Sequence, residues 1–115
     1  MVRLLLIEDE NDSAQLILSF FKKKGLDVKR ASGLNEAREL LKEFTPDYVL
    51  LDLNLPDGSG FEFIPYLNDR YPDCKVVINS AYDTDEEKER AKSLGVISFI
   101  SKPLNFSRLS EAIGV

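Results

Sequence analysis

Residues 48–52, Tyr-Val-Leu-Leu-Asp, form an apolar run that ends in one acidic residue. A short run that is apolar throughout is typical of a strand buried on both faces, as in a parallel sheet covered by helices on each side. Asp52 closes this run, at a position where a carboxylate is costly to bury without a partner. We therefore expect a central strand that delivers Asp52 to a polar site at its carboxyl end.

Short apolar runs alternate with longer amphipathic stretches on both sides of this segment. The predicted strands cover residues 3–7, 26–31, 48–52, 74–80 and 96–100. The predicted helices cover residues 12–24, 34–44, 61–71, 84–94 and 106–113. Residues 53–59 contain Pro56, Asp57 and Gly58 and have the composition of a turn, so we assign no functional role to Asp57. Five alternations of strand and helix predict a parallel sheet with helices on both faces.

Two of the predicted helices carry local signals about where they begin and end. Pro65 lies inside the apolar pattern of the third helix, where an interior proline costs ~3 kcal/mol. We therefore expect this helix either to begin late, with Pro65 in its first turn, or to kink there. In the fourth helix, residues 84–87 (Thr-Asp-Glu-Glu) predict a capping box, and Gly95 predicts the C-terminal stop.

Composition excludes several classes of function. The chain has 115 residues, a formal net charge of −5, no histidine and one cysteine. The acidic balance argues against direct nucleic-acid binding, which needs clustered Lys and Arg. The absence of histidine excludes Ser-His-Asp and Cys-His nucleophiles, and it leaves hard cations with oxygen ligands as the metals to consider. No apolar run reaches the roughly 18–20 residues that span a bilayer, and the single cysteine fits a reducing cytoplasm.

Polar side chains stand at the ends of four of the five predicted strands. They are Glu8 and Asp9, Asp52, Ser80, and Lys102. Because the functional crevice of such a fold lies at the carboxyl ends of the strands, we expect these side chains to converge. Three clustered carboxylates repel one another and call for a multivalent cation, and Mg²⁺ needs only one or two of them. Cation, hydroxyl and ammonium together predict a clamp for a phosphoryl group in transfer.

Most of these residues also have an ordinary structural explanation when each is taken alone. A strand-end aspartate such as Asp9 is commonly a turn residue or a helix cap. Ser80 alone is explained as a turn residue, and Lys102 alone as a solvated charge. Asp52 is the exception, because it closes a wholly apolar strand.

Four segments resemble the motifs of response-regulator receiver domains, in the order and with the spacings of that family. They are residues 5–10 (Leu-Leu-Ile-Glu-Asp-Glu), 50–58 (Leu-Leu-Asp-Leu-Asn-Leu-Pro-Asp-Gly), 79–81 (Asn-Ser-Ala) and 99–103 (Phe-Ile-Ser-Lys-Pro). The resemblance covers essentially the whole chain. It implies one receiver domain over residues 1–115, a doubly wound, flavodoxin-like α/β fold whose five-stranded parallel sheet has the order 2-1-3-4-5 and is flanked by five helices.

The resemblance implies roles for the acidic residues and their neighbours. Asp52 would take a phosphoryl group from a phosphohistidine of a sensor histidine kinase or a phosphotransfer protein. Asp9 and Asp52 would bind Mg²⁺, with Mn²⁺ as an alternative ion. Asn54 would offer its backbone carbonyl to the metal, and Glu8, where the family often has a second aspartate, would act through water.

The resemblance also implies a phosphate-binding set and a switch. Ser80 and the backbone amide of Ala81 would hold phosphoryl oxygens, and Lys102 would pair with the acyl phosphate. Ser80 and Phe99 would form the switch. Pro103 would have a structural role, with a cis peptide bond after Lys102.

At the level of function, the resemblance implies a cytoplasmic signalling phosphoacceptor that catalyses its own phosphorylation and dephosphorylation, and not an enzyme with other substrates. The output surface would consist of residues 84–94, 96–100 and the last helix. The output partner is not identified, and no contact with nucleic acid or membrane is expected. Ser98 stands where many transcription-factor receivers have an aspartate, so a phosphorylation-dependent homodimer is left open. Because no output domain follows residue 115, we expect a stand-alone or an excised receiver.

Two other functions are weighed against this one. A phosphatase of the haloacid dehalogenase type needs a second aspartate two residues after its nucleophile, as general acid, and Asn54 cannot serve. A pseudo-receiver that never takes phosphate would lack the acidic pair, the acceptor or the lysine. All of these residues are present in this chain.

Overall fold

The computed structural model describes every residue from 1 to 115. Its helices and strands are β1 (Arg3–Ile7), α1 (Asn11–Lys23), β2 (Asp27–Ala31), α2 (Leu34–Leu41), β3 (Tyr48–Leu51), β4 (Asn54–Leu55), β5 (Gly58–Ser59), α3 (Gly60–Arg70), β6 (Lys75–Ser80), α4 (Asp85–Ser93), β7 (Ser98–Ser101) and α5 (Phe106–Ile113). None of the helices combines the length and the apolar composition that crossing a bilayer requires.

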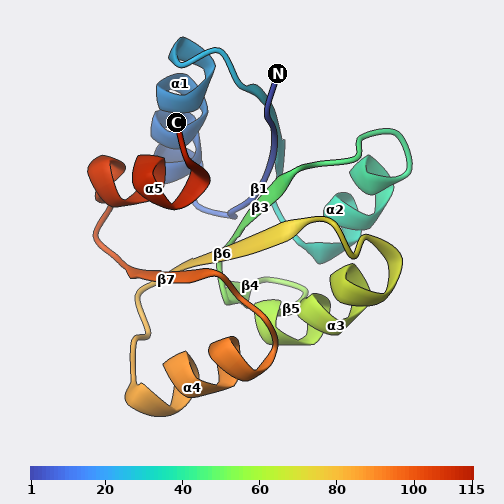
Figure 1. Cartoon of the computed structure of the whole chain (residues 1–115), viewed down its shortest axis with the longest axis vertical. Helices are drawn as coiled ribbons and strands as arrows, with labels where there is room; N and C mark the ends of the chain where they lie inside the picture. The colour runs from blue at the N-terminus through green and yellow to red at the C-terminus, as the bar shows by residue number, and fades with distance from the viewer.

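Five strands form one parallel sheet in the order β2-β1-β3-β6-β7 (Figure 1). The predicted parallel sheet, its strand order and the five flanking helices are confirmed. Strand β3 lies at the centre of this sheet, between β1 and β6. One detail was not predicted: the turn at residues 53–59 contains a short antiparallel hairpin, in which β4 pairs with β5.

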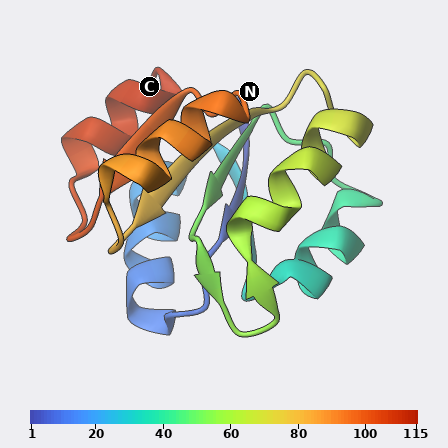
Figure 2. The same ribbon diagram turned by 90° about the horizontal axis from the view of Figure 1, so that it is seen from below.

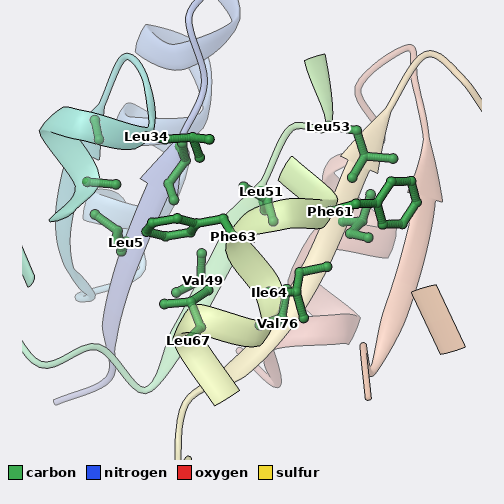
Figure 3. Packing of buried hydrophobic residues seen from close by; sticks show 14 of the residues in the cluster. Leu5, Leu34, Val49, Leu51, Leu53, Phe61, Phe63, Ile64, Leu67 and Val76 are labelled. Atoms are coloured by element: carbon green, nitrogen blue, oxygen red, sulfur yellow. The ribbon is translucent and has the colours of Figure 1, made fainter. Parts of the chain in front are cut away.

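Helices cover both faces of the sheet, and each face has its own apolar core. Helices α1 and α5 lie on one face, and α2, α3 and α4 lie on the other (Figure 1). Side chains alternate along β3, so Val49 and Leu51 point into the larger cluster while Leu50 points into the smaller one. Figure 3 shows Phe63 of α3 packed in the larger cluster together with Leu5 and Leu51. Burial on both faces explains why the run at residues 48–51 is apolar throughout.

Helix α3 contains Pro65 in its interior. It begins at Gly60 and continues through Pro65 to Arg70 (Figure 2), so the expectation of a late start is wrong. The Ser59 hydroxyl accepts a hydrogen bond from the Phe61 N–H at 3.2 Å and so caps the earlier start. Each large apolar side chain that α3 buries contributes roughly 1.5–3 kcal/mol. Together they outweigh the ~3 kcal/mol that an interior proline costs.

The predicted capping box of α4 is half formed. The Thr84 hydroxyl accepts a hydrogen bond from the Glu87 N–H at 3.2 Å, as expected. The Glu87 side chain does not complete the box, because its buried Oε2 has no hydrogen-bond partner. The predicted stop at Gly95 is confirmed by its φ of 86°, a left-handed conformation that favours glycine.

Asp57, predicted only as a turn residue, caps a helix that is distant in sequence. Its carboxylate accepts hydrogen bonds from the N–H groups of Leu34 at 2.8 Å and Asn35 at 2.9 Å. The N-cap of α2 is Gly33, which has no side chain for this purpose. A Cβ atom at Gly33 would lie 2.8 Å from Asp57 Oδ1, so glycine leaves the space that the carboxylate occupies. Asp57 therefore ties the β4–β5 hairpin to the start of α2.

We expect Asp57→Ala to lower the thermal unfolding midpoint by a few degrees at pH 7, because α2 loses its cap. Hydrogen bonds from the backbone of Asn35 and Leu34 hold the pKa of the Asp57 carboxyl below its ordinary value of 3.8. A carboxyl with a lowered pKa in the folded state stabilises the protein above pH 3.8 and loses this effect as the pH falls through the folded pKa.

Unfolding curves at pH 7 and below pH 3.8 measure this difference between wild type and variant. Asp73→Ala, which removes an exposed aspartate in the loop before β6, is the matched control. A difference that persists unchanged at the lower pH would contradict the role of the ionised carboxylate.

Candidate functional site

Three carboxylates meet at the carboxyl edge of the sheet. Glu8 and Asp9 follow β1, and Asp52 follows β3, its neighbour in the sheet. Ile7 pairs with Leu51, so the next residue on each strand reaches the edge at the same level. One carboxylate oxygen from each of the three residues lies within 4.8 Å of the others. Glu8 and Asp52 are buried, with exposed fractions of 2% and 7%, while Asp9 is exposed.

Lys102 places an ammonium group between two of these carboxylates. It follows β7, and its Nζ lies 2.9 Å from Glu8 Oε1 and 3.2 Å from Asp52 Oδ2. One ammonium offsets one of the three negative charges, so the ionised cluster keeps an excess of negative charge. The structure therefore brings together four residues that the sequence analysis placed at strand ends.

The pKa values reflect this crowding. Burial raises the pKa of the Glu8 carboxyl, and the nearby Asp52 carboxylate adds to the rise, while the hydrogen bond from Lys102 opposes it. Burial by itself would lower the pKa of Lys102, but the hydrogen bond to Glu8 and the charge of Asp52 together raise it. The two shifts have different leading causes, burial for Glu8 and the two carboxylates for Lys102. The lysine stays charged, and one carboxylate is left without a full counter-charge.

The carboxylate cluster fits a hard divalent cation. Its ligand atoms are all oxygens, and Asp9 keeps the site accessible from solvent. Mg²⁺ prefers carboxylate oxygens and keeps several water ligands, so one or two direct protein ligands are enough. Asp9 and Asp52 would hold such an ion, with Glu8 beside them. Its charge would also offset the repulsion from Asp52, which adds to the effect of burial on the pKa of Glu8.

Two of the predicted phosphate-binding residues lie at the carboxyl end of the strand next to β3. Ser80 ends β6, next to β3 in the sheet, and is fully buried. Its oxygen accepts a hydrogen bond from the Tyr82 N–H at 3.1 Å, and its own proton remains free to be donated. Ala81 follows Ser80 and is exposed. The N–H of Asn54 donates to Asp52 Oδ1 at 3.3 Å, which holds the start of the β4–β5 hairpin against the acidic cluster.

The predicted switch and structural residues lie on and after β7. Phe99 is half-buried and packs against the larger apolar cluster, on the same side as α4. The peptide bond between Lys102 and Pro103 is cis, as expected. The Ser101 hydroxyl donates to Asp83 at 2.9 Å and so connects β7 to the loop between β6 and α4.

Two residues at this site were missed by the sequence analysis. The Arg30 guanidinium donates to the backbone carbonyl of Glu8 at 3.0 and 2.9 Å and to that of Asp9 at 3.2 Å. An arginine near the end of an edge strand resembles any solvated charge, so no local signal identified it. Asn79 is a buried amide one residue before Ser80. Its signal was available, because it is a polar residue within the apolar run of β6.

Comparisons with known proteins agree with this geometry. The family model of the response regulator receiver domain matches residues 4–114. The response regulator protein PilR of Pseudomonas aeruginosa is 34% identical over 109 residues, which cover 95% of this chain and 24% of PilR. This chain therefore spans about a quarter of the length of that relative.

Solved structures share the fold over nearly the full chain. A CheY-like response regulator receiver domain protein from Methanospirillum hungatei has a TM-score of 0.93 at 23% identity, covering 99% of this chain and 91% of that one. The non-phosphorylated HemR receiver domain from Leptospira biflexa has a TM-score of 0.91 at 28% identity, covering 100% of this chain and 96% of that one.

We expect Arg30→Ala to weaken Mg²⁺ binding about tenfold, because residues that orient metal ligands commonly contribute at least that much. The guanidinium holds the two carbonyls of the acidic loop, and its loss frees that loop. Calorimetric or fluorescence titration with Mg²⁺ measures the affinity. Lys29→Ala removes an exposed positive charge from the same strand and is the control for charge alone. Equal affinities of the two variants would contradict a positioning role for Arg30.

Proposed function

The chain belongs to the response regulator receiver domain family, which is a family of signalling domains, and on this premise we propose that residues 1–115 act as a Mg²⁺-dependent phosphoacceptor with Asp52 as the acceptor. The observation that carries the proposal is the contact of Lys102 with both Asp52 and Glu8. It puts a phosphate-binding cation beside a carboxylate that adjoins a metal-binding cluster. The phosphoryl donor is a phosphohistidine of a sensor histidine kinase or phosphotransfer protein, and the location is cytoplasmic.

In the proposed transfer, an oxygen of Asp52 forms a bond to phosphorus while the bond from phosphorus to the histidine nitrogen breaks. The electron pair of the broken bond stays on the imidazole nitrogen. Asp9, Asp52 and the Asn54 carbonyl would hold Mg²⁺, with Glu8 acting through water, and the ion would offset charge on the carboxylates and on the phosphoryl oxygens. Mn²⁺ can replace it, since both ions suit oxygen ligands.

Three groups of the chain would hold the transferred phosphoryl group. The Lys102 ammonium turns from the carboxylates to a phosphoryl oxygen, and charge-assisted hydrogen bonds of this kind are the strong ones. The Ser80 hydroxyl still has its proton to donate, because its oxygen is engaged only as an acceptor. The backbone N–H of Ala81, the residue after Ser80, would donate to another phosphoryl oxygen. The same groups also serve hydrolysis, in which the oxygen of a water molecule forms a bond to phosphorus while the bond from phosphorus to the Asp52 oxygen breaks. The carboxylate keeps the electron pair and inorganic phosphate leaves, so the domain catalyses both its phosphorylation and its dephosphorylation.

The signal leaves the site through Ser80 and Phe99. A phosphoryl group on Asp52 adds charge and acceptor oxygens, which draw the Ser80 hydroxyl toward it. The Phe99 ring, half-buried beside this region, then turns inward. Helix α4 suits a moving element because Ala91 is its only buried residue, whereas α1 buries three. The output surface consists of α4, β7 and α5, and it meets an output partner or a second copy of the chain.

We expect the wild-type protein to gain one phosphoryl group on incubation with acetyl phosphate and Mg²⁺, and Asp52→Asn to gain none, because the nucleophile is lost. Intact-mass measurement detects the adduct. Asp57→Asn, which changes an exposed aspartate outside the cluster, is the control and should still gain phosphate. Continuous turnover of unrelated phosphomonoesters would indicate a phosphatase, and no adduct on the wild type would indicate a pseudo-receiver. Undiminished phosphate on Asp52→Asn would exclude Asp52 as the acceptor.

Ser80→Ala should still accept phosphate, because Asp52, the metal ligands and Lys102 remain, but it should transmit the change poorly to Phe99. Amide NMR spectra of the wild type and the variant, each with and without beryllium fluoride and Mg²⁺, measure this coupling. The wild type should show large shifts over residues 84–101, and the variant much smaller ones. Equally large shifts in both proteins would mean that Ser80 does not couple the site to β7 and α4.

A further inference from the structure

Asn79 is a buried polar side chain whose oxygen has no partner. Its exposed fraction is 3%, and its Oδ1 accepts no hydrogen bond. It lies on β6 after Val76, Val77 and Ile78, all of which are buried apolar residues. A buried acceptor without a donor loses its hydrogen bonds to water and gains none in return, so each such group calls for an explanation. Nothing in the resting geometry of the site provides one.

The pairing of the strands places Asn79 directly beside Asp52. Leu51 of β3 pairs with Ile78 of β6, and both side chains belong to the larger cluster. The next residue on each strand is Asp52 on one and Asn79 on the other. Because side chains alternate along a strand, these two point to the opposite face from their predecessors. Asn79 therefore lies one strand away from Asp52, at the same level and on the same face.

The same pairing puts the Lys102 side chain over Asn79. Lys102 follows β7, whose backbone continues the ladder because the Lys102 N–H donates to the Ser80 carbonyl at 2.8 Å. Strand β6 separates β7 from β3 and β1 in the sheet. The Lys102 ammonium nevertheless contacts Asp52, which follows β3, and Glu8, which follows β1. Its side chain must cross the end of β6, and Asn79 is the last buried residue of β6 on that face.

We propose that Asn79 is a positioning residue for Lys102. When the carboxylates bind a cation and a phosphoryl group, the unpartnered Oδ1 of Asn79 accepts a hydrogen bond from the Lys102 ammonium. An ammonium has three protons to donate, and here it gives two of them to Glu8 and Asp52. This inference rests on the proposed function, in which those carboxylates serve a cation and a phosphoryl group. One proton of the ammonium then goes to the phosphoryl group. Asn79 Oδ1 is the buried neutral acceptor that can take another and hold the side chain in that direction.

Two variants of nearly the same shape test the proposal. Asn79→Leu removes the acceptor, and Asn79→Asp keeps an oxygen at the same place. We expect Asn79→Leu to unfold at a higher temperature than the wild type without metal, because an apolar group replaces an unpaired polar one. We also expect it to bind beryllium fluoride in the presence of Mg²⁺ about tenfold more weakly, the size of change that one hydrogen bond to a charged group produces. A residue with a merely structural role would not raise the unfolding temperature and weaken beryllium fluoride binding in the same variant.

The Lys102 ammonium itself provides a spectroscopic readout. Nitrogen NMR of labelled lysine should show the same Lys102 signal in the metal-free wild type and Asn79→Leu, because both carboxylates hold the ammonium there. On addition of beryllium fluoride and Mg²⁺ the signal should move in the wild type and Asn79→Asp, and it should move differently in Asn79→Leu. If Asn79→Leu binds as tightly as the wild type with the same Lys102 signal, or if it loses stability and binding together, the inference is overturned. If the wild type itself does not bind, the proposed function fails, and this inference fails with it.

Discussion

The Lys102 ammonium lies between two buried carboxylates, 2.9 Å from Glu8 and 3.2 Å from Asp52. Two buried carboxylates this close repel each other and have lost hydration, so a positive charge between them is strongly stabilising. The lysine comes from β7, and the carboxylates come from β1 and β3, so the contact forms only when the parallel sheet has its observed order. The fold and the site therefore depend on each other. The sheet brings the two carboxylates together, and Lys102 offsets the repulsion that would otherwise oppose folding.

Because of this contact, oxygens of Glu8 and Asp52 are already bound to the Lys102 ammonium, so a ligand must replace existing interactions. In the proposed function, an entering cation would compete with Lys102 for the carboxylate oxygens, and a phosphoryl group would compete with the carboxylates for the Lys102 ammonium. The backbone N–H of Lys102 is bonded to the carbonyl of Ser80 at 2.8 Å, and Ser101 is bonded to Asp83 in the loop that precedes α4. Lys102 therefore belongs to the same pair of strands, β6 and β7, that carries Ser80 and Phe99. The site and the proposed output surface therefore share β7 and the loop before α4.

Periodicity alone predicted most of this arrangement, because a parallel sheet brings strand ends to one edge whatever the residues there are. Glu8, Asp52 and Lys102 were predicted in this way, and the structure brings them together. The sequence did not predict contacts made by residues with ordinary local patterns. Asp57 looks like a turn residue, yet it caps α2 across 23 positions. Arg30 looks solvated, yet it holds the acidic loop. Such contacts depend on how helices and strands far apart in the sequence are placed relative to one another. A short stretch of sequence does not contain that information.

Most of the chain satisfies its physical requirements at every level, so the places that do not are informative. Two buried side-chain atoms lack a hydrogen-bond partner, Asn79 Oδ1 at the site and Glu87 Oε2 on α4. A third conflict is the raised pKa of Glu8. None of these lies in the apolar clusters under α1, α2 or α3, where an unsatisfied group would bring only instability. They lie at the acidic edge and on α4, the helix with the fewest buried residues, which are the two ends of the proposed route of the signal. In the proposed function, a state that relieves them would gain free energy, and phosphorylation of Asp52 would use that gain to shift α4.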